Sequence, residues 1–165
     1  MANLSADDIA AKFCRITSQA IVTVADMTED LRVAGLTEVT PESMRLIASM
    51  VEVYDNRKLI GMFIAQSDNW QGIIDRDLRF FMRVLPALFE GLPVDTSLMT
   101  GPIKMYLQHK EGKLILPGGR AFPITDQRIE GLWKYFDQLM KGAYIFAQKT
   151  NTEGALAKYK RPLGF

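Results

Sequence analysis

The chain has 165 residues, of which 48% are hydrophobic and 24% are charged, and its formal net charge is +1. These values are typical of a globular domain with its own hydrophobic core and differ from those of disordered chains. The near-neutral charge excludes a basic surface over the whole molecule, so any nucleic-acid site would have to be a local patch.

The first predicted helix begins at Ser5, whose side chain can accept a backbone N–H bond, and ends before Gly35. Between these points apolar residues recur at alternating steps of three and four, which predicts one buried helical face. These residues are Ile9, Phe13, Ile16, Ala20, Val24, Met27 and Leu31. A second helix is predicted to start at Thr40-Pro41-Glu42, which supplies a cap, a proline at the first helical position and an acid in the first turn.

The middle of the sequence predicts one short helix and one long helix. Residues Leu59 to Ile64 are apolar at nearly every position, which indicates a short, mostly buried helix. A long helix should follow from about Asp68 to Phe89, carrying the stretch WQGIIDRDLRFF, with a kink or an early stop near Pro86. Its predicted inner face holds Trp70, Ile73, Ile74, Leu78, Phe81, Leu85 and Leu88. On its outer face we expect Asp75 to pair with Arg79 one turn further along.

Residues 94–124 are the least helical part of the sequence, because glycines and prolines recur there. Apolar and polar residues alternate from Ile103 to Leu107, and Leu114-Ile115-Leu116 follows a KEGK turn, which favours a β-hairpin. The alternative is a short helix from Pro102 to Glu111, ended by Gly112. A last long helix is predicted to begin at the cap Thr125-Asp126.

Together these elements predict a mainly α fold. We expect a single-domain helical bundle of about five helices over residues 1–154, with a small β-hairpin or irregular insertion near residues 100–120. Residues 155–165 form a basic tail that we expect to be flexible. The N-terminal residues lack the basic start and long apolar run of a secretory signal, and no stretch approaches the roughly 20 apolar residues that span a bilayer. We therefore expect an intracellular protein that is not secreted and has no membrane partner.

Few residues of the sequence point to catalysis or to metal binding. The single cysteine, Cys14, cannot form an intramolecular disulfide or a several-cysteine zinc site, and the single histidine, His109, is its only possible imidazole base. Cys14 lies beside Phe13 on the apolar stripe, where a cysteine usually behaves as a small hydrophobic residue. The segment LPGGRAFP lacks the glycine spacing and the lysine of a phosphate-binding loop. We therefore predict a non-enzymatic protein with no catalytic residue, no metal and no cofactor.

Arginines and aromatic residues are the candidates for partner binding. Arg76, Arg79 and Arg83 are three and four residues apart, so a straight helix would present them on one face. With Arg57, Lys58 and the basic tail they could form a strip that binds phosphate or carboxylate groups. The alternative is a solvated helix face. Phe80 and Tyr135 fall off the apolar stripes of their helices and could face a second chain. The predicted partner-binding residues are Arg76, Arg79, Phe80, Arg83, Tyr135, Lys158, Lys160 and Arg161.

Three segments carry a resemblance to known proteins: LIGMFIAQSDNWQGIIDRDLRFF, LFEGLP and DQRIEGLWKYFDQLMKGAYIF. They resemble a pattern in small, mostly uncharacterised helical proteins encoded by large DNA viruses of eukaryotes. The sequence departs from that pattern at Gln71, where an aspartate is usual, and at Arg76, where a lysine is usual. The matching positions, between residues 59 and 146, are Leu59, Ile60, Phe63, Ile64, Ser67, Trp70, Asp77, Phe80, Phe81, Leu88, Phe89, Leu92, Pro93, Asp126, Trp133, Tyr135, Phe136, Leu139 and Lys141.

The resemblance implies no activity and no catalytic residue. It implies a role inside the host cell, in a virion, in capsid assembly or in a replication compartment. We therefore expect a structural or interaction protein of a virus-like assembly, with protein partners, that forms a homo-oligomer through its aromatic and arginine-rich patches. The alternative is an accessory nucleic-acid-binding protein that uses the arginine strip and the basic tail.

Overall fold

The computed structural model describes residues 3–90, 95–107, 113–115, 121–123, 126–152, 154 and 156, and most of these residues are helical. The elements in chain order are α1 (Ala6–Val33), α2 (Glu42–Glu52), α3 (Asn56–Ala65), the 3-10 helix η1 (Ser67–Asn69), α4 (Gln71–Ile74), α5 (Arg79–Leu88), α6 (Ser97–Leu107), β1 (Lys113–Ile115), β2 (Ala121–Pro123) and α7 (Asp126–Lys149). The prediction of a mainly α helical bundle is confirmed. The described part of the chain has seven α-helices rather than about five.

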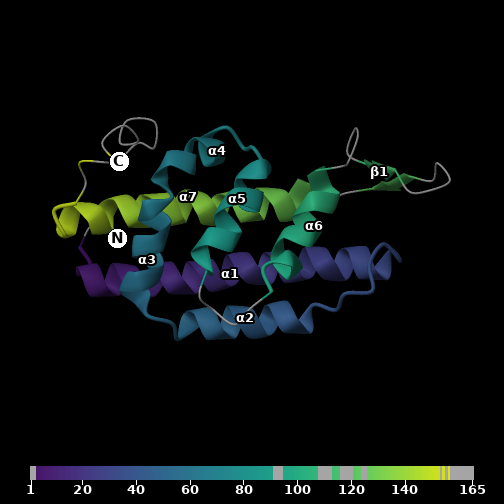
Figure 1. The fold of residues 1–165 in the computed structure, drawn as a ribbon, viewed down its shortest axis with the longest axis horizontal. Helices are drawn as coiled ribbons and strands as arrows, with labels where there is room; N and C mark the ends of the chain where they lie inside the picture. The colour runs from purple at the N-terminus through teal and green to yellow at the C-terminus, as the bar shows by residue number, and fades with distance from the viewer. Residues whose placement is uncertain are drawn as a thin grey trace.

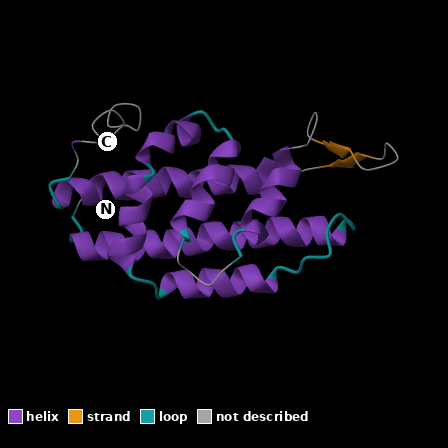
Figure 2. Cartoon of the chain, viewed as in Figure 1, coloured by secondary structure: helices purple, strands orange, loops and turns teal. Residues whose placement is uncertain are grey.

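The two longest helices, α1 and α7, lie side by side and form the spine of the bundle (Figure 1). Helix α2 packs along α1 on the side away from α7, so one long face of α2 has no neighbour in Figure 1. Helices α3, α5 and α6 run crosswise to this spine, and the two short strands project from one end of the molecule (Figure 2). The arrangement therefore leaves α2 as an outer helix.

Both ends of α1 are formed by local interactions that the sequence predicts. At the start, the Asp8 N–H donates to Ser5 Oγ (3.1 Å) and the Ser5 N–H donates back to the Asp8 carboxylate (3.3 Å), which is a capping box. At the end, Gly35 has a φ of 77°. The Gly35 N–H donates to the Arg32 carbonyl (3.0 Å) and the next N–H, of Leu36, donates to the Leu31 carbonyl (2.9 Å). This is the Schellman motif that a glycine at this position favours.

A charged network on α1 holds the two neighbouring helices in register. Asp26 lies 3.4 Å from Arg128 of α7 and 3.7 Å from Arg45 of α2. Arg128 also contacts Asp30 at 3.2 Å, and this hydrogen bond is the main cause that raises the pKa of Arg128. One side of α1 therefore makes polar contacts with both flanking helices, in addition to its apolar packing.

Aromatic rings fill the middle of the core. The centroids of Phe81 and Trp133 are 4.5 Å apart, and those of Phe80 and Phe136 are 5.5 Å apart in an edge-to-face arrangement. The Trp70 indole N–H, buried with its ring, donates to the Phe63 carbonyl at 3.2 Å. We call this set the aromatic cluster, and its members are Phe63, Trp70, Phe80, Phe81, Trp133 and Phe136. It joins α3, α5 and α7 around one centre.

The strand predicted over residues 103–107 is wrong, because these residues belong to α6. Met99, Ile103 and Tyr106 are buried, and their spacing of four and three is helical rather than alternating. The predicted alternative of a short helix is closer, although α6 begins earlier, at Ser97. The strands that do form lie further along the chain, where β1 pairs antiparallel with β2 and Leu114 faces Phe122. The observed pairing therefore differs from the predicted hairpin.

Candidate interaction surfaces

A sharp corner replaces the single helix predicted across residues 68–89. Helix α4 ends in a second Schellman motif, in which the Arg76 N–H donates to the Ile73 carbonyl (3.1 Å) and the Asp77 N–H donates to the Gly72 carbonyl (2.9 Å). Arg76 has a φ of 55°, the left-handed conformation that this motif usually assigns to glycine. Since α5 starts only at Arg79, the predicted common helix face for the three arginines does not exist.

Gly72 allows the two sides of the corner to come together. A Cβ atom on Gly72 would lie 2.9 Å from the Cβ of Phe80, closer than two such carbons pack. With glycine there, α5 folds back and places Phe80 in the aromatic cluster, where its side chain is fully buried. The prediction that Phe80 faces a partner is therefore wrong, because that prediction assumes a straight helix.

Arg76 is held by groups of α7. Its Nη1 donates to Asp137 Oδ1 at 2.7 Å and its Nη2 donates to Asp137 Oδ2 at 2.6 Å. The guanidinium carbon lies 5.6 Å from the centroid of the Trp133 ring, a cation–π distance. The hydrogen bonds that Arg76 donates to the Asp137 carboxylate raise the pKa of Arg76 above its ordinary value. This side chain is thus a structural link between the corner and α7.

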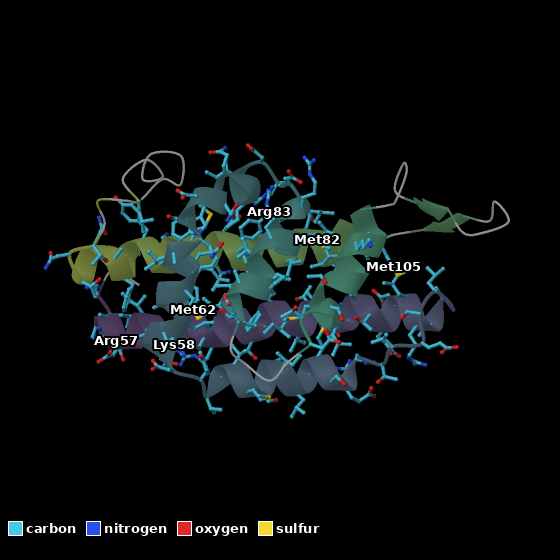
Figure 3. All side chains as sticks on the ribbon, in the orientation of Figure 1. Arg57, Lys58, Met62, Met82, Arg83 and Met105 are labelled. Carbon is cyan, nitrogen blue, oxygen red and sulfur yellow. The ribbon has the colours of Figure 1, made fainter. Side chains whose placement is uncertain are left out.

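The other two arginines of the predicted strip have different surroundings. Arg79 pairs with Asp77, whose Oδ2 lies 2.9 Å from its Nη2, and this contact lowers the pKa of Asp77. The predicted pair of Asp75 with Arg79 is wrong, because Asp75 instead accepts from the Gln71 side chain at 3.1 Å. Arg83 is exposed on α5 (Figure 3). Two of the three guanidinium groups are thus neutralised by neighbouring carboxylates, which weakens the case for a phosphate-binding strip.

The remaining predicted partner-binding residues lie elsewhere. Tyr135 is half-buried on α7 and packs against the core. Lys158, Lys160 and Arg161 lie outside the described residues. The structure therefore does not assemble the eight predicted residues into one surface.

The outer face of α2 carries an apolar surface that the sequence interpretation missed. We call it the α2 stripe. Its members, at steps of three, four and three, are the polar Ser43, the apolar Leu46 and Met50, and the apolar Val53, which is the C-cap residue directly after α2. Leu46 is 63% exposed and Val53 is 87% exposed. The sequence does contain a pattern that indicates this surface. After one apolar face of the helix is assigned to the core, a second set of apolar residues at helical spacing remains.

Two charged side chains of α2 lie beside the α2 stripe, whereas the exposed Glu42, at the first position of α2, lies one turn before Leu46 on the same side. Arg45 contacts Asp26 of α1, and Glu52 accepts a hydrogen bond from Ser18 of α1 at 3.4 Å. Both side chains therefore reach back toward the spine of the bundle. None of the four stripe residues is itself charged, so covering these four does not bury a charge.

Cys14 has the surroundings of a core residue. It is fully buried on α1, and burial, followed by the nearby charge of Asp55, raises the pKa of its thiol to about 11. It is therefore protonated at neutral pH and is a poor nucleophile. His109, the base considered for it, lies outside the described residues.

Within the described part of the chain, no group of three or more His, Cys, Asp or Glu side chains is placed to hold a metal ion. None of the helices described there combines the length and the apolar character that a membrane span requires. No family model, curated protein or solved structure matches the chain. The functional interpretation therefore depends on the surfaces of the chain itself.

Proposed function

We propose that this chain is a non-enzymatic interaction protein that self-associates through the α2 stripe. The observation that carries the proposal is the exposure of Leu46, on the outer helix α2, and of Val53, the residue that follows α2. Contiguous patches of exposed apolar side chains mark protein–protein interaction sites, and we take this short stripe to be part of such a patch. In line with the resemblance to helical viral proteins, we place this self-association within a larger virus-like assembly.

A second copy of the chain fits the α2 stripe by symmetry. Apolar residues at alternating steps of three and four form the narrow seam along which two helices pack. If two copies of α2 pair antiparallel about a twofold axis, Leu46 of each copy lies opposite Val53 of the other, and both apolar residues are covered at once. The net charge of +1 adds little repulsion between copies. In this pairing the apolar residues of each copy would thus cover those of the other.

The proposed contact is small, because α2 has only 11 residues. It buries less surface than the roughly 1,600 Å² of a standard stable interface. We therefore expect a weak dimer, with a dissociation constant on the order of 10 to 100 μM. Contacts of this strength act in assemblies where several are made together.

The test is the mass of the protein in solution, measured by sedimentation from about 5 to about 500 μM, a range that brackets the expected dissociation constant. After nuclease treatment, the mass should rise from monomer to dimer across this range. The double variant Leu46→Glu/Val53→Glu should remain a monomer, because dimerisation would bury its new charges.

The matched control is Val33→Glu, a change at a 74% exposed valine that ends α1 and lies off the α2 stripe. This variant should dimerise like the unmodified protein. A protein that stays monomeric at every concentration contradicts the proposal. Association that disappears with nuclease, or weakens steeply with salt, would instead favour the nucleic-acid-binding alternative.

A further inference from the structure

A cavity of about 170 Å³ lies between the C-terminal half of α1, the loop that follows α1, and α6. Its apolar walls are formed by Leu31, Val39, Leu98, Pro102 and Met105. None of the nine residues that line it, all within the described part of the chain, is charged. This cavity is distinct from the α2 stripe, since the two have no residue in common.

Among the side chains that line the cavity, the polar groups are three hydroxyls, and two of them already donate elsewhere. The Thr28 hydroxyl donates to the Val24 carbonyl at 3.1 Å, and the Ser97 hydroxyl donates to the Asp95 carboxylate at 2.6 Å. Thr37 Oγ1 accepts from the Val39 N–H at 3.2 Å, and its own proton has no acceptor among the residues that the structure describes. The cavity therefore offers one free donor, on Thr37.

This combination suits a small organic molecule better than an ion. The pocket is open to solvent beside Val39, Ser97 and Gly101, which are exposed, so a small molecule can enter it from solution. A space of roughly 150 Å³ can hold one benzene ring. A charged molecule would find no opposite charge among the nine lining residues and would lose part of its hydration against the apolar walls. The size of the pocket, its mainly apolar lining and the absence of charged lining residues therefore all favour a small, uncharged, mainly apolar molecule.

We propose that this cavity binds a compact, uncharged, mainly apolar molecule about the size of one aromatic ring. The molecule carries one hydrogen-bond acceptor, which receives the proton of the Thr37 hydroxyl. The walls formed by Leu31 and Leu98 cover the ring. Benzyl alcohol has these properties and serves as the probe, with toluene, benzoate and benzylamine of similar size as comparisons.

Methionine methyl groups report where the probe binds. Met105 forms part of the cavity wall, whereas Met62 and Met82 lie on α3 and α5 (Figure 3). In protein labelled with ¹³C at the methionine methyls, benzyl alcohol should shift the Met105 resonance and saturate, while those of Met62 and Met82 stay in place. The dissociation constant should be on the order of 1 mM, because so small a ligand makes few contacts.

Variants separate the cavity from non-specific partition of the probe. Gly101 lines the cavity, and a Cβ built on it meets no heavy atom within 4 Å, so Gly101→Leu can fill the space without a backbone clash. It should abolish the saturable Met105 shift. Thr37→Val should weaken benzyl alcohol by about 3- to 10-fold, to the level of toluene, through the loss of one hydrogen bond.

The ¹⁵N spectrum of each variant establishes that it is folded before the comparison is made. Benzoate and benzylamine should leave Met105 unshifted. The proposal is overturned by equal shifts at Met62, Met82 and Met105, by a titration that does not saturate, by binding of the charged probes, or by an unchanged dissociation constant in folded Gly101→Leu.

Discussion

Arg76 and Asp137 lie 61 residues apart in the sequence and face each other through two parallel hydrogen bonds of 2.7 and 2.6 Å. The first residue occupies a left-handed turn between two short helices, and the second lies in the middle of α7. The planar guanidinium is the group suited to this geometry, since it meets both carboxylate oxygens and also stacks on Trp133. These contacts thereby join the corner at Arg76 to α7.

The first prediction concerns this pair. Arg76→Ala and Asp137→Ala should each lower the free energy of unfolding, and a double-mutant cycle measured by urea denaturation should give a coupling energy of about 0.5–1 kcal/mol. We expect no larger value, because the two side chains are 45% and 44% exposed. Additive effects of the two single substitutions would contradict the coupling.

A glycine substitution at Arg76 separates the effect of the backbone conformation from the effect of losing the contact with Asp137. Glycine adopts the left-handed conformation without the Cβ clash that alanine meets there. Arg76→Gly should therefore be more stable than Arg76→Ala by about 1 kcal/mol, although both lose the contact with Asp137. If the two variants unfold at the same urea concentration, the φ of Arg76 carries no strain.

A pair of glycine substitutions tests the close approach at the corner. Gly72→Ala should destabilise the protein by about 1–3 kcal/mol, since the new Cβ would lie 2.9 Å from Phe80 Cβ. Gly61→Ala, inside α3, is the matched control, because a Cβ there meets no heavy atom within 4 Å. It should raise stability by up to about 1 kcal/mol through helix propensity. Thermal unfolding of the two variants should therefore shift in opposite directions.

The position of Phe80 makes a further prediction. Phe80→Ala should lower the free energy of unfolding by about 3–5 kcal/mol, because it removes a fully buried ring from the aromatic cluster. Arg79→Ala, the neighbouring exposed residue, should change it by no more than about 0.5 kcal/mol. An outward-facing Phe80 would make the two substitutions similarly mild.

Alkaline pH should destabilise the protein through two buried groups. Burial raises the pKa of Cys14 from 9.0 to about 11, and burial, followed by the charge of Asp30, raises that of Tyr106 from 10.0 to about 12. The unfolded chain releases these protons at lower pH than the folded chain. The stabilisation of the folded state by each protonated group is therefore fully present below pH 9 and is lost as pH rises toward 12. Each can amount to about 2–3 kcal/mol.

The measurement is the free energy of unfolding from pH 8 to pH 12. Its decline should be shallower in Cys14→Ala between pH 9 and pH 11, and in Tyr106→Phe between pH 10 and pH 12. The slopes are compared rather than the absolute stabilities, because each substitution also changes packing. Slopes identical to that of the unmodified protein would contradict the assignment.

Features encoded within one helical turn were predictable from the sequence. The capping box of Ser5 and the left-handed Gly35 are both local, and α1 begins and ends where they indicate. The corner was not predictable in this way, because its Schellman motif has arginine where glycine or asparagine is the usual residue. Its stabilising partner, Asp137, is remote in sequence, so no local pattern reveals the turn.

The candidate interaction surface was likewise predictable from the sequence only in part. A straight helix across residues 68–89 would make Arg76, Arg79 and Phe80 outward-facing. In the structure a corner at Arg76 replaces that straight helix, so the three residues do not share an outer face. The spacing of Leu46, Met50 and Val53 was visible in the sequence, but only the packing of α2 against α1 shows that this face is the uncovered one. Periodicity identifies an apolar face, whereas tertiary structure decides which face is covered.

The arginine at the corner also bears on how the chain folds. A turn built on glycine can form early in an isolated segment, but the turn at Arg76 gains its stabilising contacts only when Asp137 and Trp133 are in place. Residues 67–90 alone should therefore hold the corner less firmly than the complete chain does, and its amide protons should exchange with solvent faster in that fragment. The bend is thus a cooperative property of the complete chain.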